Sequence, residues 1–378
     1  MSETEHVAHA EPVAPTERVA QAEHVAKTEP VANTERVADV GEDALLSRVF
    51  PLLPAGTATL LGPGDDAAVL AAPDGRVVVS TDVLVEGRHF RRGWGTGADL
   101  GWRAAAQNLA DVAAMGARPT AIVVGLVLPG DVEVDWVLDL ARGLAAACSP
   151  HGVGVVGGDL AGGDAVVVAV TVHGDLQGRE PVRRDGARPG DVLALAGTLG
   201  RAAAGLALLT ADDGAGGRST EGRGFDDGNE ADDGAHPTTV DHAKLVGSYL
   251  RPTPPLELGP VAAGAGARAM IDVSDGLLRD AGRVARASGV RIDISTEALE
   301  PNTAPLAAAA RALGTDPLTW VLTGGEDHGL LATFPEGAVP PGFVVVGRVL
   351  DAAGDPRVLV DGREHGGSPG YDHFGGES

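Results

Sequence analysis

The sequence predicts a two-domain protein of the α/β or α+β class. Short apolar runs that suit strands alternate with helical stretches in both halves of the chain, which is typical of these classes. The chain has 378 residues, more than one hydrophobic core usually organises, so two domains are expected. It contains no run of 18 or more apolar residues, so we expect no membrane-spanning segment.

Residues 1–40 predict a disordered acidic tail. A Glu-x-Val-Ala motif recurs every six residues from Glu5 to Glu35. Six residues rotate a helix by roughly 240°, so successive valines spread around it and form no apolar face. Pro12 and Pro30 also interrupt helical structure. The segment is too acidic for a secretory signal and lacks the apolar stretch that such signals carry.

The first folded domain is expected over residues 41–184. Asp99 and Asp131 are expected to cap its two helices, and Gly116 lies near the end of the first. The expected elements, in chain order, are a strand at 76–82, a helix at 99–117, a strand at 120–128, a helix at 131–148, a strand at 153–163 that passes into a Gly-rich loop, and a strand at 165–176.

The second domain is expected over residues 185–378. Ser274 or Asp275 is expected to cap its central helix, and Gly289 to end it. Residues 211–235 carry eight acidic and two basic residues with almost nothing to bury, so they predict a flexible insert. The expected elements are a turn and strand at 185–197, a helix at 200–210, a strand–helix–strand unit at 269–294, and strands at 329–334 and 343–350.

The charge of the chain narrows its possible functions. A net charge of −24 argues against a surface that binds DNA or RNA. An acidic protein can still bind a polyphosphate when metal cations bridge the two. Lys27 and Lys244 are the only lysines, and no Walker-type phosphate loop is present. Cys148 is the single cysteine, so no internal disulfide can form and a cytoplasmic location is expected.

Carboxylates recur where a strand meets a loop. Any one of them has an ordinary explanation as a turn residue or a helix cap. Their number at element ends, where α/β folds build sites, favours a shared site. Clustered carboxylates repel one another unless cations neutralise them, and oxygen ligands favour Mg²⁺, so several Mg²⁺ ions and phosphoryl transfer are indicated. The residues concerned are Asp65, Asp66, Asp82, Asp159, Asp272 and Asp275.

Asp111 lies in the middle of a predicted helix. Arg103, Gln107 and Asp111 are spaced by four residues and share one helical stripe, with Asn108 beside it. Such a stripe is usually a solvated face. A second interpretation is that Asp111 belongs to the same metal site as the aspartates at strand ends.

Together these motifs resemble the thiamine-monophosphate kinase family, within the superfamily of aminoimidazole ribonucleotide synthetase and selenophosphate synthetase. They occur in family order over roughly residues 41–375. The matching stretches are GPGDDAAVL, STDVLVEGRHF, NLADVAAMGA, VGGDLAGG, HGDL, DGARPGD, GRAAAGLALL, IDVSDGL, TGGED and GYDHF.

The resemblance implies a two-domain aminoimidazole ribonucleotide synthetase-like fold, a homodimer, and direct transfer of the γ-phosphoryl group of ATP to thiamine monophosphate. The positions matching the family's Mg²⁺ ligands are Asp66, Ser80, Thr81, Asp82, Asp111, Asp159, Asp272 and Asp275, of which Asp66, Asp82, Asp111, Asp159 and Asp275 are also taken as catalytic. Its nucleotide positions match Gly158, Asp159, Arg184 and Ser274, and its thiamine-phosphate positions match His89, Glu326 and Tyr371.

The sequence departs from the family pattern in places, and alternatives stay open. His328 and Gly329 follow TGGED where the family often has an aromatic and an acidic residue, and Pro255 replaces a frequent basic residue. Another enzyme of the superfamily is one alternative, although selenophosphate synthetase would need a reactive Cys near a Lys at the start of the fold. A non-catalytic acidic metal-binding protein is the other.

Overall fold

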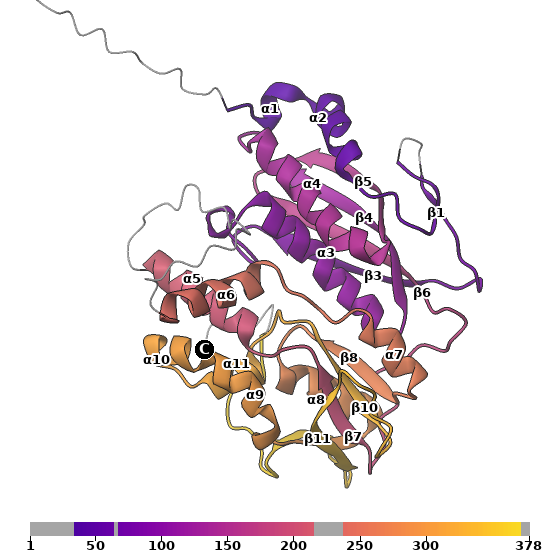
Figure 1. Ribbon diagram of the computed structural model, residues 1–378, viewed down its shortest axis with the longest axis vertical. Coiled ribbons are helices and arrows are strands. Elements are labelled where there is room, and N and C mark those ends of the chain that lie inside the picture. Colours follow the sequence, from indigo (N-terminus) through magenta and orange to yellow (C-terminus); the bar gives the residue numbers. More distant parts are fainter. Residues whose placement is uncertain (1–33, 64–66, 215–236, 372–378) are drawn as a thin grey trace, which may run out of the picture. The chain divides into compact units, whose positions relative to one another are not determined.

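Two sheets of different size organise the part of the chain that the structure describes. The structure is a computed structural model that describes residues 34–63, 67–214 and 237–371. It places a four-stranded and a six-stranded sheet in the two halves of the chain, with helices packed on both (Figure 1). Within these ranges no helix is long and apolar enough to cross a membrane.

The N-terminal sheet has the strand order β3-β6-β4-β5. Its strands are β3 (Val78–Val85), β4 (Arg118–Leu128), β5 (Gly154–Gly162) and β6 (Val167–Asp175). The β4–β5 pair is parallel, and the other pairs are antiparallel. The helices α3 (Gly97–Ala114) and α4 (Val134–Cys148) pack against each other and against this sheet. A Cβ at Gly101 would lie 2.1 Å from the Leu140 carbonyl oxygen, so glycine allows the two helices to approach closely.

Short elements at the start of the chain complete this half. The helix α1 (Val37–Val40) is followed by α2 (Glu42–Val49) and by the 3₁₀ turn η1 (Phe50–Leu52). The strands β1 (Thr59–Leu61) and β2 (Val69–Leu70) form a small hairpin. Two further 3₁₀ turns of this half are η2 (Arg92–Trp94) and η3 (Ser149–His151), whereas η4 (Glu297–Leu299) and η5 (Ala304–Leu306) lie in the C-terminal half.

The C-terminal sheet has the strand order β12-β9-β11-β7-β10-β8 and is antiparallel except for the β12–β9 pair. Its strands are β7 (Val192–Ala196), β8 (Ala269–Val273), β9 (Val290–Ile294), β10 (Gly329–Phe334), β11 (Val344–Asp351) and β12 (Val358–Val360). The helices of this half are α5 (Arg201–Gly214), α6 (Pro237–Leu250), α7 (Leu258–Gly264), α8 (Leu277–Ser288), α9 (Glu300–Thr303), α10 (Ala307–Leu313) and α11 (Pro317–Thr323). The mixed sheets confirm the predicted α/β or α+β class.

The two faces of β8 belong to different parts of the core. Ile271 and Val273 pack in one cluster with residues of α8, whereas Met270 packs in another cluster that includes residues of α3. Side chains alternate between the faces of a strand, so Asp272 lies on the same face as Met270. The sheet of the C-terminal half thus presents a carboxylate toward the side on which α3 packs.

The structure corrects several predicted helix starts and one loop. Thr96, not Asp99, is the N-cap of α3, and Asp99 is the third residue of a capping box. The helix α4 starts after Glu133 with no side-chain cap, so Asp131 does not cap it. Gly276, with a φ of 118°, precedes α8 in place of Ser274 or Asp275, while Gly289 ends this helix as predicted. The glycines at 157–162 continue β5 instead of forming a loop, because β4 pairs with them.

Residues 36–40, which the sequence analysis assigned to the tail, have regular structure. Arg36 forms a β-bridge with Glu133, and the Val37 amide donates a hydrogen bond to the Val132 carbonyl oxygen. Val37 and Val40 pack against the core. Residues 1–33 and most of the predicted insert at 211–235 lie outside the described residues, although α5 includes residues 211–214.

Candidate active site

The polar stripe of α3 is buried, contrary to the usual behaviour of such a stripe. Arg103 is 3% exposed, Gln107 is 7% exposed, and Asn108 has no exposed surface. Contacts of α3 with β3 on one side and β8 and β10 on the other explain the burial. Burying this many polar side chains is unfavourable unless they are paired, so the partners of the stripe identify the site.

Side chains of β3 pair with this stripe. The Ser80 hydroxyl donates a hydrogen bond to Asp111 Oδ2 at 2.6 Å. The Gln107 amide donates to Asp82 Oδ2 at 3.3 Å, and Asn108 Oδ1 accepts from the Asp82 backbone amide. Ser80 and Asp82 are two residues apart and therefore share the face of β3 that α3 covers.

Thr81 points to the opposite face of β3. Its hydroxyl pairs with that of Thr171 on β6 at 3.2 Å and donates to the Val170 carbonyl oxygen. The alternation of side chains along a strand separates it from Ser80 and Asp82. The Thr81 side chain is therefore not part of the buried network, although the resemblance implies a metal position there.

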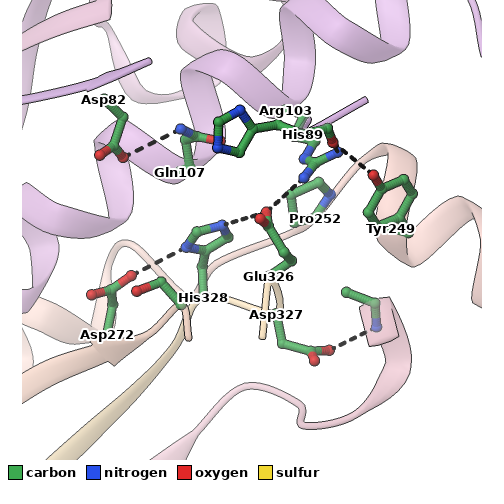
Figure 2. A network of polar contacts seen from close by, with 12 residues as sticks. Asp82, His89, Arg103, Gln107, Tyr249, Pro252, Asp272, Glu326, Asp327 and His328 are labelled. Carbon is green, nitrogen blue, oxygen red and sulfur yellow. Dashed lines mark hydrogen bonds and ion pairs between the residues drawn. The ribbon is translucent and has the colours of Figure 1, made fainter. Parts of the chain in front are cut away.

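The C-terminal half contributes two carboxylates and a histidine to the same network (Figure 2). His328 Nδ1 lies 3.1 Å from Asp272 Oδ2, and its Nε2 lies 3.7 Å from Glu326 Oε2. The guanidinium of Arg103 forms an ion pair with Glu326 at 2.9 Å. Charged side chains thus contact one another in sequence from Arg103 on α3, through Glu326 and His328 before β10, to Asp272 on β8.

Burial and the repulsion of neighbouring carboxylates raise the pKa values of Asp82 and Asp111. The pKa of Asp111 is raised to about 7 by burial, and by the neighbouring charges of Asp272 and Asp82. Burial also raises the pKa of Asp82, with Asp272 adding to the effect. These three carboxylates come from α3, β3 and β8, and both Asp82 and Asp272 lie near enough to Asp111 to disfavour its ionisation. A cation close to these carboxylates would relieve their mutual repulsion.

The cations already present act on Glu326 and His328. Burial favours the neutral form of Glu326, but Arg103 and His328 hold its pKa far below the usual value. Burial likewise opposes protonation of His328, but Asp272 and Glu326 raise its pKa to about 10. Glu326 is therefore a carboxylate, and His328 an imidazolium, at neutral pH.

The three residues Glu326, Asp327 and His328 are each tied to a different element. Glu326 and His328 have left-handed φ values of 70° and 53°, which are unfavourable for residues other than glycine. The Asp327 carboxylate accepts backbone hydrogen bonds from the start of α5, at Gly200 and Ala202 among others. Burial raises the Asp327 pKa to about 7. Anchoring on α3, α5 and β8 holds this segment in its strained conformation.

The loop from β8 to α8 adjoins this segment. The Ser274 carbonyl oxygen accepts a hydrogen bond from the Glu326 amide, and the Asp275 carbonyl oxygen accepts one from the Tyr371 amide at 2.9 Å. Arg283 on α8 pairs with the carboxylate of Asp275 and with the buried Asp280. The loop therefore brings residues 274 and 275, Glu326 and the described end of the chain together.

His89 lies at the end of the segment after β3. Its Nδ1 accepts a hydrogen bond from the Val85 amide, which places the proton of a neutral ring on Nε2. Its carbonyl oxygen accepts from Arg103 Nη1 at 3.0 Å and from the Tyr249 hydroxyl at 2.8 Å. The predicted residue is thus connected through its backbone to the buried network.

Other predicted residues lie apart from this network. Gly158 and the exposed Asp159 line a mainly apolar pocket together with residues of α2, α4 and β4. A Cβ at Gly158 would lie 2.0 Å from the Val124 carbonyl oxygen, so the strand pairing itself requires glycine there. Arg184 is exposed on the segment before β7. Asp65 and Asp66 lie outside the described residues.

No three His, Cys, Asp or Glu side chains of the described ranges stand close enough to hold a metal ion together.

The sequence analysis did not predict the participation of Tyr249, Asp280 and Asp327 in the site. It named Arg103 as part of the helical stripe but did not assign it to the site. The stripe Arg103-Gln107-Asp111 was a usable signal. Because the other faces of this helix are apolar, the helix is expected to be surrounded by protein, and a polar stripe on it is then expected to be buried. Tyr249 carried no local signal, since its role depends on a contact across 146 residues of sequence.

Two family models match the chain. The model described as AIR synthase related protein, N-terminal domain, matches residues 64–176, and the C-terminal domain model matches residues 188–338. The chain is 48% identical over 336 residues to the thiamine-monophosphate kinase of Mycobacterium tuberculosis, which covers 89% of this chain and 92% of the relative. It is 41% identical to that of Corynebacterium glutamicum over 82% of this chain and 88% of the relative.

Solved structures of similar proteins have the same fold. AaThiL complexed with AMPPCP and TMP has a TM-score of 0.68 and 31% identity, over 91% of this chain and all of the other. The thiamine-monophosphate kinase from Stenotrophomonas maltophilia has a TM-score of 0.67 and 33% identity, over 85% of this chain and 95% of the other. The hydrogenase maturation protein HypE, at 19% identity and a TM-score of 0.61, shares the fold alone.

Proposed function

The chain belongs to the thiamine-monophosphate kinase family, and from this membership we infer that it transfers the γ-phosphoryl group of ATP to thiamine monophosphate, giving thiamine diphosphate and ADP. The observation that carries the inference is the 48% identity over 336 residues. The relative AaThiL has been solved with AMPPCP, an ATP analogue, and with TMP, which is consistent with these two substrates. The buried network that joins both halves of this chain is the proposed site for them.

The chemistry requires two anions to approach each other. The acceptor is already a charged phosphate, so the reaction needs no strong general base. The main obstacle is electrostatic, and the carboxylates of this site would increase it if they stood alone. A cation is therefore part of the proposal.

The donor atoms of the site are of the kind that Mg²⁺ binds. Phosphate oxygens of the substrates are proposed to complete the coordination, because no three acidic or histidine side chains of the described residues stand close enough to hold an ion by themselves. Asp82, Asp111 and Asp272 supply hard oxygen ligands, and the raised pKa of Asp111 reflects, after burial, repulsion that a cation would relieve. When bound, Mg²⁺ supplies charge neutralisation at phosphate oxygens and a template for in-line transfer. Asp66 and Asp275, with the Ser80 hydroxyl and the backbone oxygens of Ser80 and Thr81, complete the set that we propose around this cluster. Asp159, which lies at the pocket beside β5, is proposed to hold a separate ion.

The pocket beside β5 is the proposed site for the nucleotide base. It lies between α2, α4 and β5, is lined mainly by apolar side chains, and has Gly158 and Asp159 at its polar edge. An apolar pocket with few polar groups suits a planar heterocycle. Ser274 and Arg184 are proposed to contact the phosphates, Ser274 from the loop beside Asp275 and Arg184 through a bidentate guanidinium.

Glu326, His89 and Tyr371 are the proposed neighbours of thiamine monophosphate. The thiazolium of thiamine is a cation, and Glu326 stays ionised because Arg103 and His328 lower its pKa. The Tyr371 ring is 49% exposed beside the Asp275 loop and can contact a cation through its face. His89 presents Nε2–H, a donor that suits a phosphate oxygen.

A homodimer in the cytoplasm is part of the same proposal. The face of the N-terminal sheet opposite α3 carries exposed apolar side chains at Val79 and Val83, at 55% and 47% exposure, around the Thr81–Thr171 pair. A second copy of this chain covering that face would remove apolar surface from water. The use of ATP and the buried free thiol of Cys148 fit a cytoplasmic location.

The test of the reaction is an assay for thiamine diphosphate. Purified protein is incubated with ATP and thiamine monophosphate, with and without Mg²⁺, and the product is separated from the substrates. We expect equal amounts of thiamine diphosphate and ADP in the presence of Mg²⁺. ADP formation that does not depend on thiamine monophosphate would indicate a different acceptor.

A further inference from the structure

Arg103 connects four segments of the chain through one side chain. It lies on α3 and is 3% exposed. One guanidinium nitrogen pairs with Glu326 at 2.9 Å, and another donates to the His89 carbonyl oxygen at 3.0 Å. The guanidinium carbon lies 4.3 Å from the centre of the Tyr249 ring, which belongs to α6 (Figure 2).

Stability alone is a poor reason to bury this charge. A buried ion pair is often no more stabilising than apolar residues of similar volume. Arg103 also leaves its buried Nε without a hydrogen-bond partner among the described residues. The arrangement therefore carries a cost that a residue selected only for packing would avoid.

Each partner of Arg103 is fixed by a second contact. The Tyr249 hydroxyl donates to the same His89 carbonyl oxygen at 2.8 Å. Glu326 has a left-handed φ of 70°, and its amide donates to the Ser274 carbonyl oxygen at 2.8 Å. Strained residues persist where surrounding contacts determine their position. Arg103 thus lies between the segment that contains His89 and the segment that contains Glu326, each of which is held in place by a second contact.

We propose that Arg103 is a positioning residue for the acceptor substrate, which sets the place of Glu326 relative to His89. These two residues come from opposite halves of the chain, and one planar guanidinium spans both. Tyr249 holds the guanidinium by stacking on it and holds His89 by its hydroxyl. The proposal rests on the proposed function, because it deepens the role of the site that binds thiamine monophosphate.

The first test replaces Arg103 by lysine. Lysine keeps the positive charge, but a single ammonium cannot make both contacts in the same plane. We expect the R103K protein to show a KM for thiamine monophosphate raised about tenfold or more, as for loss of a 1.4 kcal/mol contact. We expect its KM for ATP to stay within about twofold. The matched control is R268K, since Arg268 pairs with the buried Asp191 elsewhere in the C-terminal half. It should change neither KM.

Two further variants separate positioning from general damage. Tyr249→Phe removes the hydroxyl contact with His89 and keeps the ring under Arg103, so we expect a smaller rise in the same KM. In a Glu326→Gln background, Arg103→Lys should raise this KM by less than in the parent, because the two residues act together. Equal rises in both KM values, or full additivity in the double variant, would overturn the proposal.

Hydrogen exchange gives a readout that does not need turnover. The amides of Glu326 and His328 donate to the carbonyl oxygens of Ser274 and Val273. We expect faster exchange over residues 324–329 and 85–90 in R103K and not in R268K. Unchanged exchange in both peptides would contradict positioning by Arg103. If the parent protein makes no thiamine diphosphate, the proposed function is contradicted. The hydrogen-exchange comparison would still test whether Arg103 positions Glu326 and His89.

Discussion

His328 Nδ1 lies 3.1 Å from Asp272 Oδ2, across the neighbouring ends of β10 and β8. In the sequence, His328 was only a departure from a family pattern. In the structure its ring links Asp272 to Glu326, and the two carboxylates raise its pKa to about 10 against the effect of burial. A ring that favours the protonated form at neutral pH thus lies between a proposed metal ligand and a proposed substrate ligand, where its charge offsets part of theirs.

Replacing Asp111 by asparagine should lower the rate of thiamine diphosphate formation by about 100-fold or more, because a proposed metal ligand is lost. Burial raises the Asp111 pKa from 3.8 to about 7, so the contribution of this group to the free energy of unfolding of the metal-free protein falls as pH rises between these values, and the full penalty is present at pH 8. The melting temperature of metal-free Asp111→Asn at pH 8 should therefore equal or exceed that of the parent. Asp139→Asn, at an exposed ion pair on α4, is the control. Parent-like turnover in Asp111→Asn would refute the metal assignment.

Removing Mg²⁺ with EDTA should abolish product formation, and adding Mg²⁺ back should restore it. Mg²⁺ should also raise the melting temperature of the parent, because ions that bind the folded state stabilise it. We expect a smaller rise for Asp82→Asn, which lacks one carboxylate of the cluster. A melting temperature that does not respond to Mg²⁺ at millimolar concentration would argue that these carboxylates bind no ion.

Two truncated chains should distinguish the contribution of residues 1–33 to stability and activity from that of residues 34–40. A chain starting at Thr34 should keep the parent kcat and melting temperature, since the site residues described here all follow it. A chain starting at Gly41 should melt about 3–8 °C lower, because Val37 and Val40 leave the core and each contributes about 1–2 kcal/mol. Glu35→Gln, which breaks an exposed ion pair with Arg48, should change the melting temperature little. Equal melting of the two truncated chains would show that α1 contributes nothing.

Burial raises the pKa of the Cys148 thiol to about 12, so the native protein should resist thiol-specific maleimides at pH 7.5. Labelling in denaturant should be complete and serves as the control. In the unfolded chain the thiol ionises above about pH 8.5. The unfolded state then binds fewer protons than the folded state, so the free energy of unfolding contributed by this group falls as pH rises toward 12. The Cys148→Ala protein should lack that part of the decline. Rapid labelling of native protein would disprove the burial.

Placing a charge on the exposed sheet face should dissociate the proposed dimer. Val83→Arg alters a side chain that is 47% exposed in the single chain, so its monomer should fold normally. Light scattering after gel filtration should give twice the chain mass of 38.0 kDa for the parent and the single mass for the variant, at micromolar concentration. Val344→Arg, at an exposed position on β11, is the matched control and should remain dimeric. A parent that elutes as a monomer would exclude this interface.

Most element positions followed from local patterns. The apolar runs at 120–128 and 329–334 correspond to β4 and β10 because a buried strand needs little more than a continuous apolar stretch. Helix starts were less accurate. Thr96 and Asp99 are the two partners of one capping box, and either residue type could be the cap, so only the backbone conformation decides that Thr96 is the cap. The glycines after Val156 were expected in a loop, yet β4 supplies the hydrogen bonds that keep them in a strand.

By itself, the sequence determined the class of fold, the family and the carboxylates at strand ends, because these depend on residue type and local spacing. Tertiary structure decided which of them meet. The stripe of α3 became the centre of the site because β3 and β8 cover it, and Thr81 was separated from Asp82 by the pleat of a single strand. The physical reason is that pairing across long sequence distances, as in Arg103 with Glu326, depends on how two sheets pack around one helix, which no local pattern encodes.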